Sequence, residues 1–235
     1  MVAYIKKFIL FLLLLVLLIF DFVLADNLKS DAIIDFNSMS ATELFNLGTY
    51  YFDVLDYHKA QEYYEKAAEL NHAGAINNIG MFYLKGYGVP PNYEKAVEYF
   101  EKASKLGNLD ATANLGSMYV DGKGVEKNFE IGYQYIEYAA LMGNKFALHN
   151  LGTFYAVGKR VPKDYIKARQ YFEQAANLGL NESMYSLACM YYNGDGVKRD
   201  YGIARSYAEQ ALAAGHKKAE ELLMDIQMRA RELEE

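Results

Sequence analysis

Cysteine, tryptophan and proline are nearly missing from this sequence. Its 235 residues include one cysteine, Cys189, so no disulfide can form within the chain. There is no tryptophan, only three residues are proline, and the formal net charge is −6. Nucleic acid is not an expected partner, because its binding usually needs a basic surface. We therefore expect the fold to be stabilised by side-chain packing alone.

The usual marks of catalysis and metal binding are missing too. The four histidines show no i, i+4 pairing with one another and have no accompanying cysteines, so they predict no zinc site. No Gly-x-Ser-x-Gly turn and no P-loop is present. We expect no catalytic centre, no metal and no cofactor. A Ser-His-Asp arrangement assembled in space stays open, because a triad needs no fixed spacing.

Only the start of the chain holds a long apolar run. Lys6-Lys7 precede thirteen apolar residues, Phe8 to Phe20, and Val23-Leu24-Ala25 offers small residues at a cleavage site. This pattern predicts a secretory signal peptide over 1–25, removed after Ala25, and therefore a periplasmic or secreted protein without stable membrane insertion. The alternative is a permanent anchor, for which the run is short. Residues 26–40 are interpreted as a linker.

A period of 36 residues organises the rest of the sequence. Leucine or isoleucine followed by a small residue recurs at 79-80, 115-116, 151-152 and 187-188, and tyrosine recurs at 83, 119, 155 and 191. A fixed period of this size with two helical patterns per unit is typical of a helical solenoid. We place five helix pairs at 41–72, 73–108, 109–144, 145–180 and 181–216, the first with a shorter turn, and a capping helix at 217–235.

Each unit carries its own signals for two helices. The first helix contains a glycine, as at Gly80, which we expect to allow close approach of a neighbouring helix. A Gly-x-Gly-Val loop follows, and Asn or Asp then stands where the second helix needs an N-cap. A glycine such as Gly107 ends the second helix. Tyrosines of the second helix are interpreted as spacers, and His72 and His216, at unit ends, as solvated turn residues.

These motifs resemble the Sel1-like repeat, a relative of the tetratricopeptide repeat. The resemblance rests on Ala-x-x-x-Leu-Gly-x-x-Tyr, Gly-x-Gly-Val, Asp/Asn-Tyr-x-Lys-Ala-x-x-Tyr and Ala-Ala-x-x-Gly, and it covers residues 41–216. It implies an all-α, right-handed α/α superhelical solenoid and a non-catalytic scaffold that binds another protein or a peptide. Exported bacterial members are often linked to envelope signalling or host contact.

An enzyme acting on the envelope is the alternative function. Some secreted relatives, with paired cysteines in every repeat, have been credited with penicillin binding or β-lactamase activity. This attribution does not carry over, because the chain has only Cys189. We interpret Cys189 as a small buried hydrophobe, with a reactive or intermolecular thiol as the alternative.

The resemblance to tetratricopeptide arrays implies a concave groove, lined by residues on one face of the first helix of each repeat. Asn78, Asn114 and Asn150 form a ladder one residue before each Leu/Ile-Gly pair. We expect these amides to bond the backbone of a neighbouring unit, with ligand contact as the alternative. The expected partner-binding residues are Asn77, Met81, Leu84, Ser117, Asp121, His149, Thr153, Tyr185, Tyr192 and Asn193.

Overall fold

Eleven α-helices make up the regular structure of the residues described by the computed structural model, 38–158 and 160–232. All of them belong to the unit Ser40–Glu235. The expected signal peptide, and the linker up to residue 37, lie outside the described residues. In chain order the helices are α2 (Ala41–Asp53), α3 (Tyr57–Glu69), α4 (Ala73–Lys85), α5 (Tyr93–Lys105), α6 (Leu109–Asp121), α7 (Phe129–Leu141), α8 (Lys145–Val157), α9 (Tyr165–Asn177), α10 (Asn181–Asn193), α11 (Tyr201–Ala213) and α12 (Ala219–Glu232).

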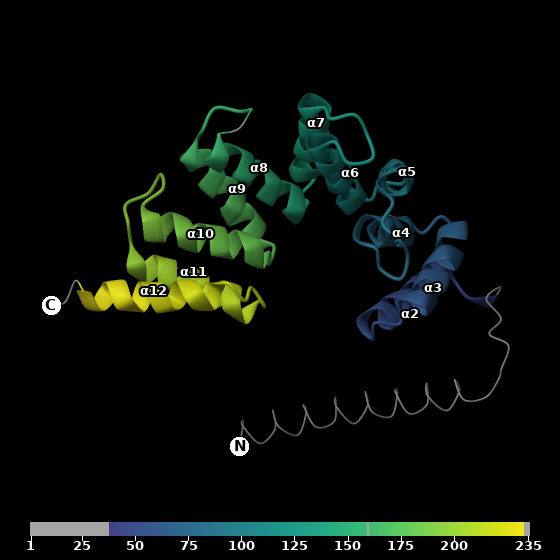
Figure 1. Cartoon of the computed structure of the whole chain (residues 1–235), viewed down its shortest axis with the longest axis horizontal. Helices are drawn as coiled ribbons and strands as arrows, with labels where there is room; N and C mark the ends of the chain where they lie inside the picture. Colours follow the sequence, from purple (N-terminus) through teal and green to yellow (C-terminus); the bar gives the residue numbers. More distant parts are fainter. Residues whose placement is uncertain (1–37, 159, 233–235) are drawn as a thin grey trace, which may run out of the picture. The chain divides into compact units, whose positions relative to one another are not determined.

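Consecutive helices pack side by side along the whole unit (Figure 1). Each repeat supplies one pair, α2 with α3 through α10 with α11, and the second helix of a pair also packs on the first helix of the next. We call these the A and B helices of a repeat. The prediction of an all-α fold built from consecutive helix pairs, as in Sel1-like and tetratricopeptide-like solenoids, is confirmed.

The predicted caps fix where each B helix begins. The side chain of Asn92 accepts a hydrogen bond of 2.8 Å from the backbone N–H of Lys95, and Asn128, Asp164 and Asp200 do the same for their own helices. Such a cap satisfies one of the N–H groups that a helix leaves without an internal partner. The B helices of repeats 2 to 5 therefore start in the same register.

The loop between the A and B helices depends on backbone that glycine adopts readily. Gly86 ends α4 with φ of 77° and donates its N–H to the carbonyl of Phe82 at 2.8 Å. In the fourth repeat Arg160 replaces the second loop glycine and keeps φ at 74°. A non-glycine residue is uncommon in this left-handed region, and the strain it carries often marks a functional position.

The helix-A glycines do allow close approach of the B helix, as predicted. A Cβ placed on Gly152 would lie 2.6 Å from two ring carbons of Phe172, and the same addition at Gly80 would meet the ring of Phe100 at 2.7 Å. Real Cβ atoms do not come this close to another atom. The glycine costs about 1 kcal/mol of helix propensity, and the buried ring across from it offsets that cost.

Stacked tyrosines join the A and B helices of every pair. The rings of Tyr83 and Tyr99 lie 5.6 Å apart and nearly parallel, and the ammonium of Lys95 lies 5.0 Å from the Tyr83 centroid. The lysine comes from the recurring Lys-Ala motif, so the motif adds a cation–π contact to the stack. The equivalent ring pairs are Tyr51 with Tyr63, Tyr119 with Tyr135, Tyr155 with Tyr171 and Tyr191 with Tyr207.

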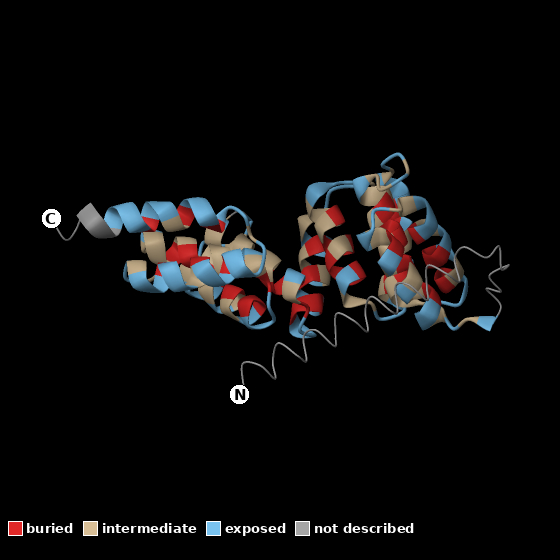
Figure 2. Ribbon diagram, turned by 90° about the horizontal axis from the view of Figure 1, so that it is seen from below, coloured by how far each residue is buried: buried red, intermediate tan, exposed pale blue. Residues whose placement is uncertain are grey.

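The buried side chains lie between neighbouring helices, and exposed ones cover the outer faces (Figure 2). At the C-terminal end, Leu222 and Ile226 of α12 are buried against Ala188, Ala204 and Ala208 of the last repeat. These two residues of α12 therefore cover apolar side chains of the last repeat, as a capping helix would. The predicted capping segment 217–235 extends past the described residues, which end at 232.

Replacing Gly152 with alanine tests the close approach. We expect Gly152→Ala to lower the free energy of unfolding by about 1–3 kcal/mol, because the new methyl group overpacks against Phe172. Gly202→Ala is the matched control. Gly202 is exposed in the first turn of α11, where a Cβ meets only the Asp200 side chain at 3.3 Å, so this change should alter stability by less than about 0.5 kcal/mol. Urea denaturation measures both, and equal effects would contradict the proposed packing.

Candidate peptide-binding cavity

Several of the expected groove residues hold neighbouring repeats together. Asn77 is only 7% exposed, and its Oδ1 accepts a 3.2 Å hydrogen bond from the Nδ2 of Asn114 in the next repeat. The same amide of Asn114 lies 3.6 Å from the sulfur of Met81. These side chains satisfy each other across the repeat boundary, so the polar groups are occupied by internal contacts.

The asparagine ladder is structural, but its partners differ from the expected ones. Asn114 bonds Asn77 and Met81, and Asn150 donates to the Oγ of Ser117 at 3.3 Å. Both amides reach side chains of the preceding repeat and not the backbone, so the predicted backbone bonds are wrong for these two residues. The helix-A backbone groups are already paired within their helix, which leaves side chains as the partners within reach.

His149 stands at the position equivalent to Asn77, two repeats further along the chain. Its Nδ1 lies 2.9 Å from the Oγ of Ser183 in the next repeat, and its ring centroid lies 5.3 Å from that of Phe172. Burial lowers the pKa of His149, with a smaller opposing effect from the carboxylate of Glu182. His149 therefore packs as a neutral ring at physiological pH.

The interpretation of His72 and His216 as solvated turn residues is wrong. The Nδ1 of His72 accepts a hydrogen bond from the N–H of Ala75, and its ring stacks on Phe45 with centroids 4.4 Å apart. His216 stacks on Tyr185 at 4.3 Å. Both rings are half-buried, because an aromatic residue of the preceding A helix covers each of them. Burial also lowers the pKa of His72.

A cavity of about 250 Å³ opens at the C-terminal ends of α6 and α8. It brings together two of the expected groove residues, Asp121 and Thr153, with residues that sequence reasoning did not select. The full lining is Val120, Asp121, Lys127, Phe129, Thr153, Phe154, Val157 and Arg160.

Apolar side chains form the floor of this cavity. The rings of Phe129 and Phe154 meet edge to face at 5.4 Å, and Val157 is 60% exposed beside them. The Oγ1 of Thr153 donates to the carbonyl of His149 at 3.0 Å, so this hydroxyl is already bonded within α8. The floor therefore presents mainly carbon to an incoming group.

Charges of both signs stand at the rim. Asp121 lies 3.1 Å from the ammonium of Lys123, and the guanidinium of Arg160 lies 5.6 Å from the Phe129 ring centroid. Phe129 and Arg160 were missed as site residues, although both depart from the repeat. Phe129 stands where the other B helices begin with tyrosine, and Arg160 replaces a loop glycine. Departures from the repeat were the available signal.

The remaining expected residues lie away from this cavity. Tyr192 packs its ring 5.6 Å from that of Tyr201, and the Nδ2 of Asn193 donates to the carboxylate of Asp195. Leu84 is half-buried on α4. The structure does not bring these three together with Asp121 and Thr153.

Cys189 is half-buried, and burial raises the pKa of its thiol while a hydrogen bond with Tyr185 partly opposes the shift. A thiol with a raised pKa forms little of the reactive thiolate, which favours the interpretation of a small packed side chain.

Among the described residues, no three His, Cys, Asp or Glu side chains gather closely enough to hold a metal ion. Within 38–158 and 160–232, no helix combines the length and apolar character needed to cross a membrane.

The fold and its repeating contacts define a solenoid of helix pairs. The Sel1 repeat family matches residues 44–72, 73–108, 109–144, 145–180 and 181–216, and the chain belongs to this family. Proteins of the family generally mediate protein–protein interactions and are typically non-catalytic scaffolds. No curated protein sequence gives a significant match.

Solved structures with the same repeat resemble the chain. A Sel1 repeat protein from Oxalobacter formigenes is 30% identical, with a TM-score of 0.66, over 78% of this chain and 75% of that one. A protective antigen of uropathogenic Escherichia coli is also 30% identical, with a TM-score of 0.63, over 81% of this chain. The chain spans only 42% of the Escherichia coli protein.

An immunity protein from Pseudomonas aeruginosa is 26% identical, with a TM-score of 0.56, and the match covers 68% of this chain and 60% of that one.

Two half-buried histidines, His72 and His149, predict a loss of stability in mild acid. The pKa of His149 and of His72 is lower in the folded chain than the unperturbed 6.5, so the unfolded state binds more protons as the pH falls through that value. We expect the free energy of unfolding to decrease from pH 7.5 to pH 5, and His149→Gln to reduce this slope. Exposed His58 on α3 is the control. Urea titrations at several pH values measure the effect, and an equal slope in His149→Gln and His58→Gln would contradict it.

Proposed function

We propose that the chain is a non-catalytic scaffold that binds a short segment of another protein in the cavity between α6 and α8. The observation that carries this proposal is the apolar floor of Phe129, Phe154 and Val157 beneath a rim with both signs of charge. A volume of about 250 Å³ is below the size usual for small-molecule sites. It suits one apolar side chain of a peptide.

The rim suggests what flanks that side chain. Asp121 already has Lys123 close by, whereas Arg160 lies over an aromatic ring. A guanidinium stacked on a ring can still donate hydrogen bonds around its plane. Arginine recognises carboxylates through paired hydrogen bonds. A peptide with an aromatic or aliphatic anchor next to an acidic residue therefore fits this cavity best.

We also propose that the chain is exported. The support is the sequence pattern of residues 1–25, which lie outside the described residues. Export would place the repeats in the periplasm or beyond, where the single half-buried thiol of Cys189 needs no disulfide partner for the helix pairs to pack.

Peptide selection tests the cavity. Peptides enriched on the folded chain from a random displayed library should carry an apolar anchor beside an acidic residue. Their affinity should fall at least about tenfold, or 1.4 kcal/mol, in Val157→Asp, because a carboxylate then stands on the apolar floor. Repeat 3 carries Asp121 at the equivalent helix-A position, so the change is compatible with the fold. Fluorescence anisotropy gives the dissociation constants.

Ile166→Glu is the matched control for this test. Ile166 is 57% exposed on α9 and does not line the cavity, and the equivalent position of repeat 2 holds Glu94. The control adds the same charge on α9, outside the cavity lining, so it should leave the affinity unchanged. Equal losses in both variants, or none in Val157→Asp, would reject the cavity as the binding site.

Mass spectrometry tests the export. Expressed with its own leader in a Gram-negative host, the chain should be recovered from the periplasm or the medium with Asp26 as its first residue. Ala25→Arg should block processing, because signal peptidase requires a small residue at that place. A wild-type chain that keeps residues 1–25 in the membrane fraction would show that the segment is an anchor.

A further inference from the structure

Helix α7 differs from the other B helices on its exposed side. Leu141 is 83% exposed and Tyr138 is 55% exposed. The equivalents of Tyr138 in the other repeats are Lys66, Lys102, Gln174 and Gln210, and those of Leu141 are Glu69, Lys105, Asn177 and Ala213. Repeat 3 therefore exposes large apolar groups at two positions where every other repeat has a polar or small residue.

The charge of α7 is also distinctive. It contains Glu130 and Glu137 but no lysine or arginine, whereas α3, α5, α9 and α11 each contain at least one basic residue. Glu137 is exposed one residue before Tyr138. The exposed surface of this helix therefore carries apolar and uncharged polar side chains, and its charged groups are all acidic.

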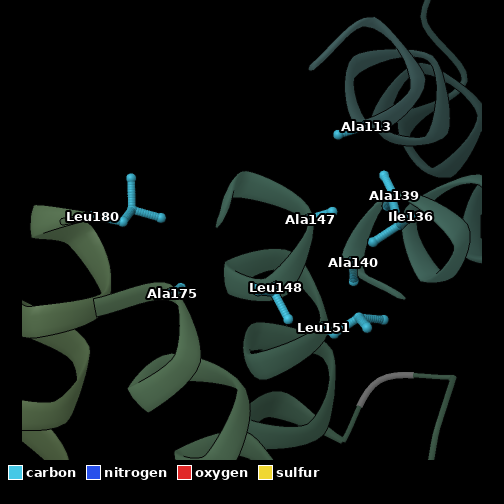
Figure 3. Packing of buried hydrophobic residues seen from close by; sticks show 9 residues of the cluster. All are labelled: Ala113, Ile136, Ala139, Ala140, Ala147, Leu148, Leu151, Ala175 and Leu180. Atoms are coloured by element: carbon cyan, nitrogen blue, oxygen red, sulfur yellow. The ribbon is translucent and has the colours of Figure 1, made fainter. Parts of the chain in front are cut away.

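An open cavity of about 630 Å³ adjoins this surface, lined by α7, α8 and α9. Its floor includes Leu148 and Leu151, which belong with Ala140 to one buried cluster (Figure 3). Glu137 and Gln174 are among its polar lining groups, and none of the lining residues is basic. The exposed side chains of Tyr138 and Leu141 are therefore continuous with a deeper apolar recess.

We propose that this face binds an amphipathic helix of another protein that carries apolar residues on one stripe and lysine or arginine beside it. Gln134, Tyr138 and Leu141 are spaced four and three residues apart and form one ridge along α7. Such a ridge packs against the groove of a second helix. The acidic groups select a basic partner by charge complementarity, and they disfavour an anionic lipid surface.

This face is separate from the cavity between α6 and α8. The two sets of lining residues share no member, and the expected ligand charges are opposite, basic here and acidic there. The inference therefore does not rest on the proposed function, and variants can distinguish the two surfaces.

A peptide panel tests the proposal on the folded chain. The panel contains designed helical peptides of fourteen residues with the same leucine stripe and with lysine, glutamine or glutamate at the flanking positions. We expect the lysine peptides to bind at least about tenfold more tightly than the glutamate peptides at low salt, and the difference to shrink as salt screens the charges. Isothermal titration calorimetry measures the constants.

The decisive variant is the double replacement Tyr138→Lys with Leu141→Lys. It copies Lys102 and Lys105 of repeat 2, so the helix pair should fold as before, which circular dichroism and melting check. It should weaken the lysine peptides at least tenfold. The matched control is Gln210→Lys with Ala213→Lys, the same register positions on α11, which should leave their binding unchanged. Val157→Asp should leave it unchanged too.

Three results would overturn the proposal. The first is equal binding of the lysine and glutamate peptides, and the second is equal loss in the α7 and α11 double variants. The third is a dimer in sedimentation velocity that the α7 variant dissociates, because the occupant would then be a second copy of the chain.

Discussion

The contact between the glycine of an A helix and the side chain of its B helix sets the geometry of each repeat. At Gly48, Gly80 and Gly152 the facing group is the ring of Tyr64, Phe100 or Phe172. A ring this close to the backbone leaves no room for a Cβ. The glycine and the facing ring together therefore set the distance between the two helices. The stacked tyrosines add a second contact between the same two helices.

Repeat 3 shows that the constraint is close packing rather than an aromatic ring. There Gly116 faces Ile136 and the carbonyl of Gly132, and Gly132 in turn faces Gly116 and Val120. Two glycines let the backbones of α6 and α7 approach directly. This is the repeat in which Gly132 replaces the alanine of the Lys-Ala motif and Phe129 replaces the leading tyrosine. The glycine at position 132 is therefore part of this close backbone approach.

The local features of the fold could be predicted from the sequence because they depend on residues close together in the chain. The N-cap of Asn92, the capping box of Ser40 and Glu43, and the positive φ of Gly86 each involve a few neighbouring residues. The partners of Asn114 and His149 could not be predicted in the same way. They stand about 34 to 37 residues away, and their choice depends on the exact rotation of one repeat against the next.

The candidate site was predicted only in part for the same reason. The sequence predicts Asp121 and Thr153 as groove residues because both lie on the same face of an A helix. Their cavity is completed by Phe129 and by Arg160 in a loop. A helical phase identifies residues on one face of one helix. It does not identify loop residues that close over that face. Departures from the repeat would have been the better guide, because constant positions are already used by the packing.

Both proposed surfaces lie where repeats 3 and 4 meet, and both are lined by α7 and α8. In a solenoid each repeat contacts only its neighbours, so this junction depends on few other parts of the chain. A ligand that binds only when α7 and α8 are packed stabilises their packing by its binding free energy. Any partner of either surface therefore favours the state that the other partner needs, even though the two sets of lining residues are separate.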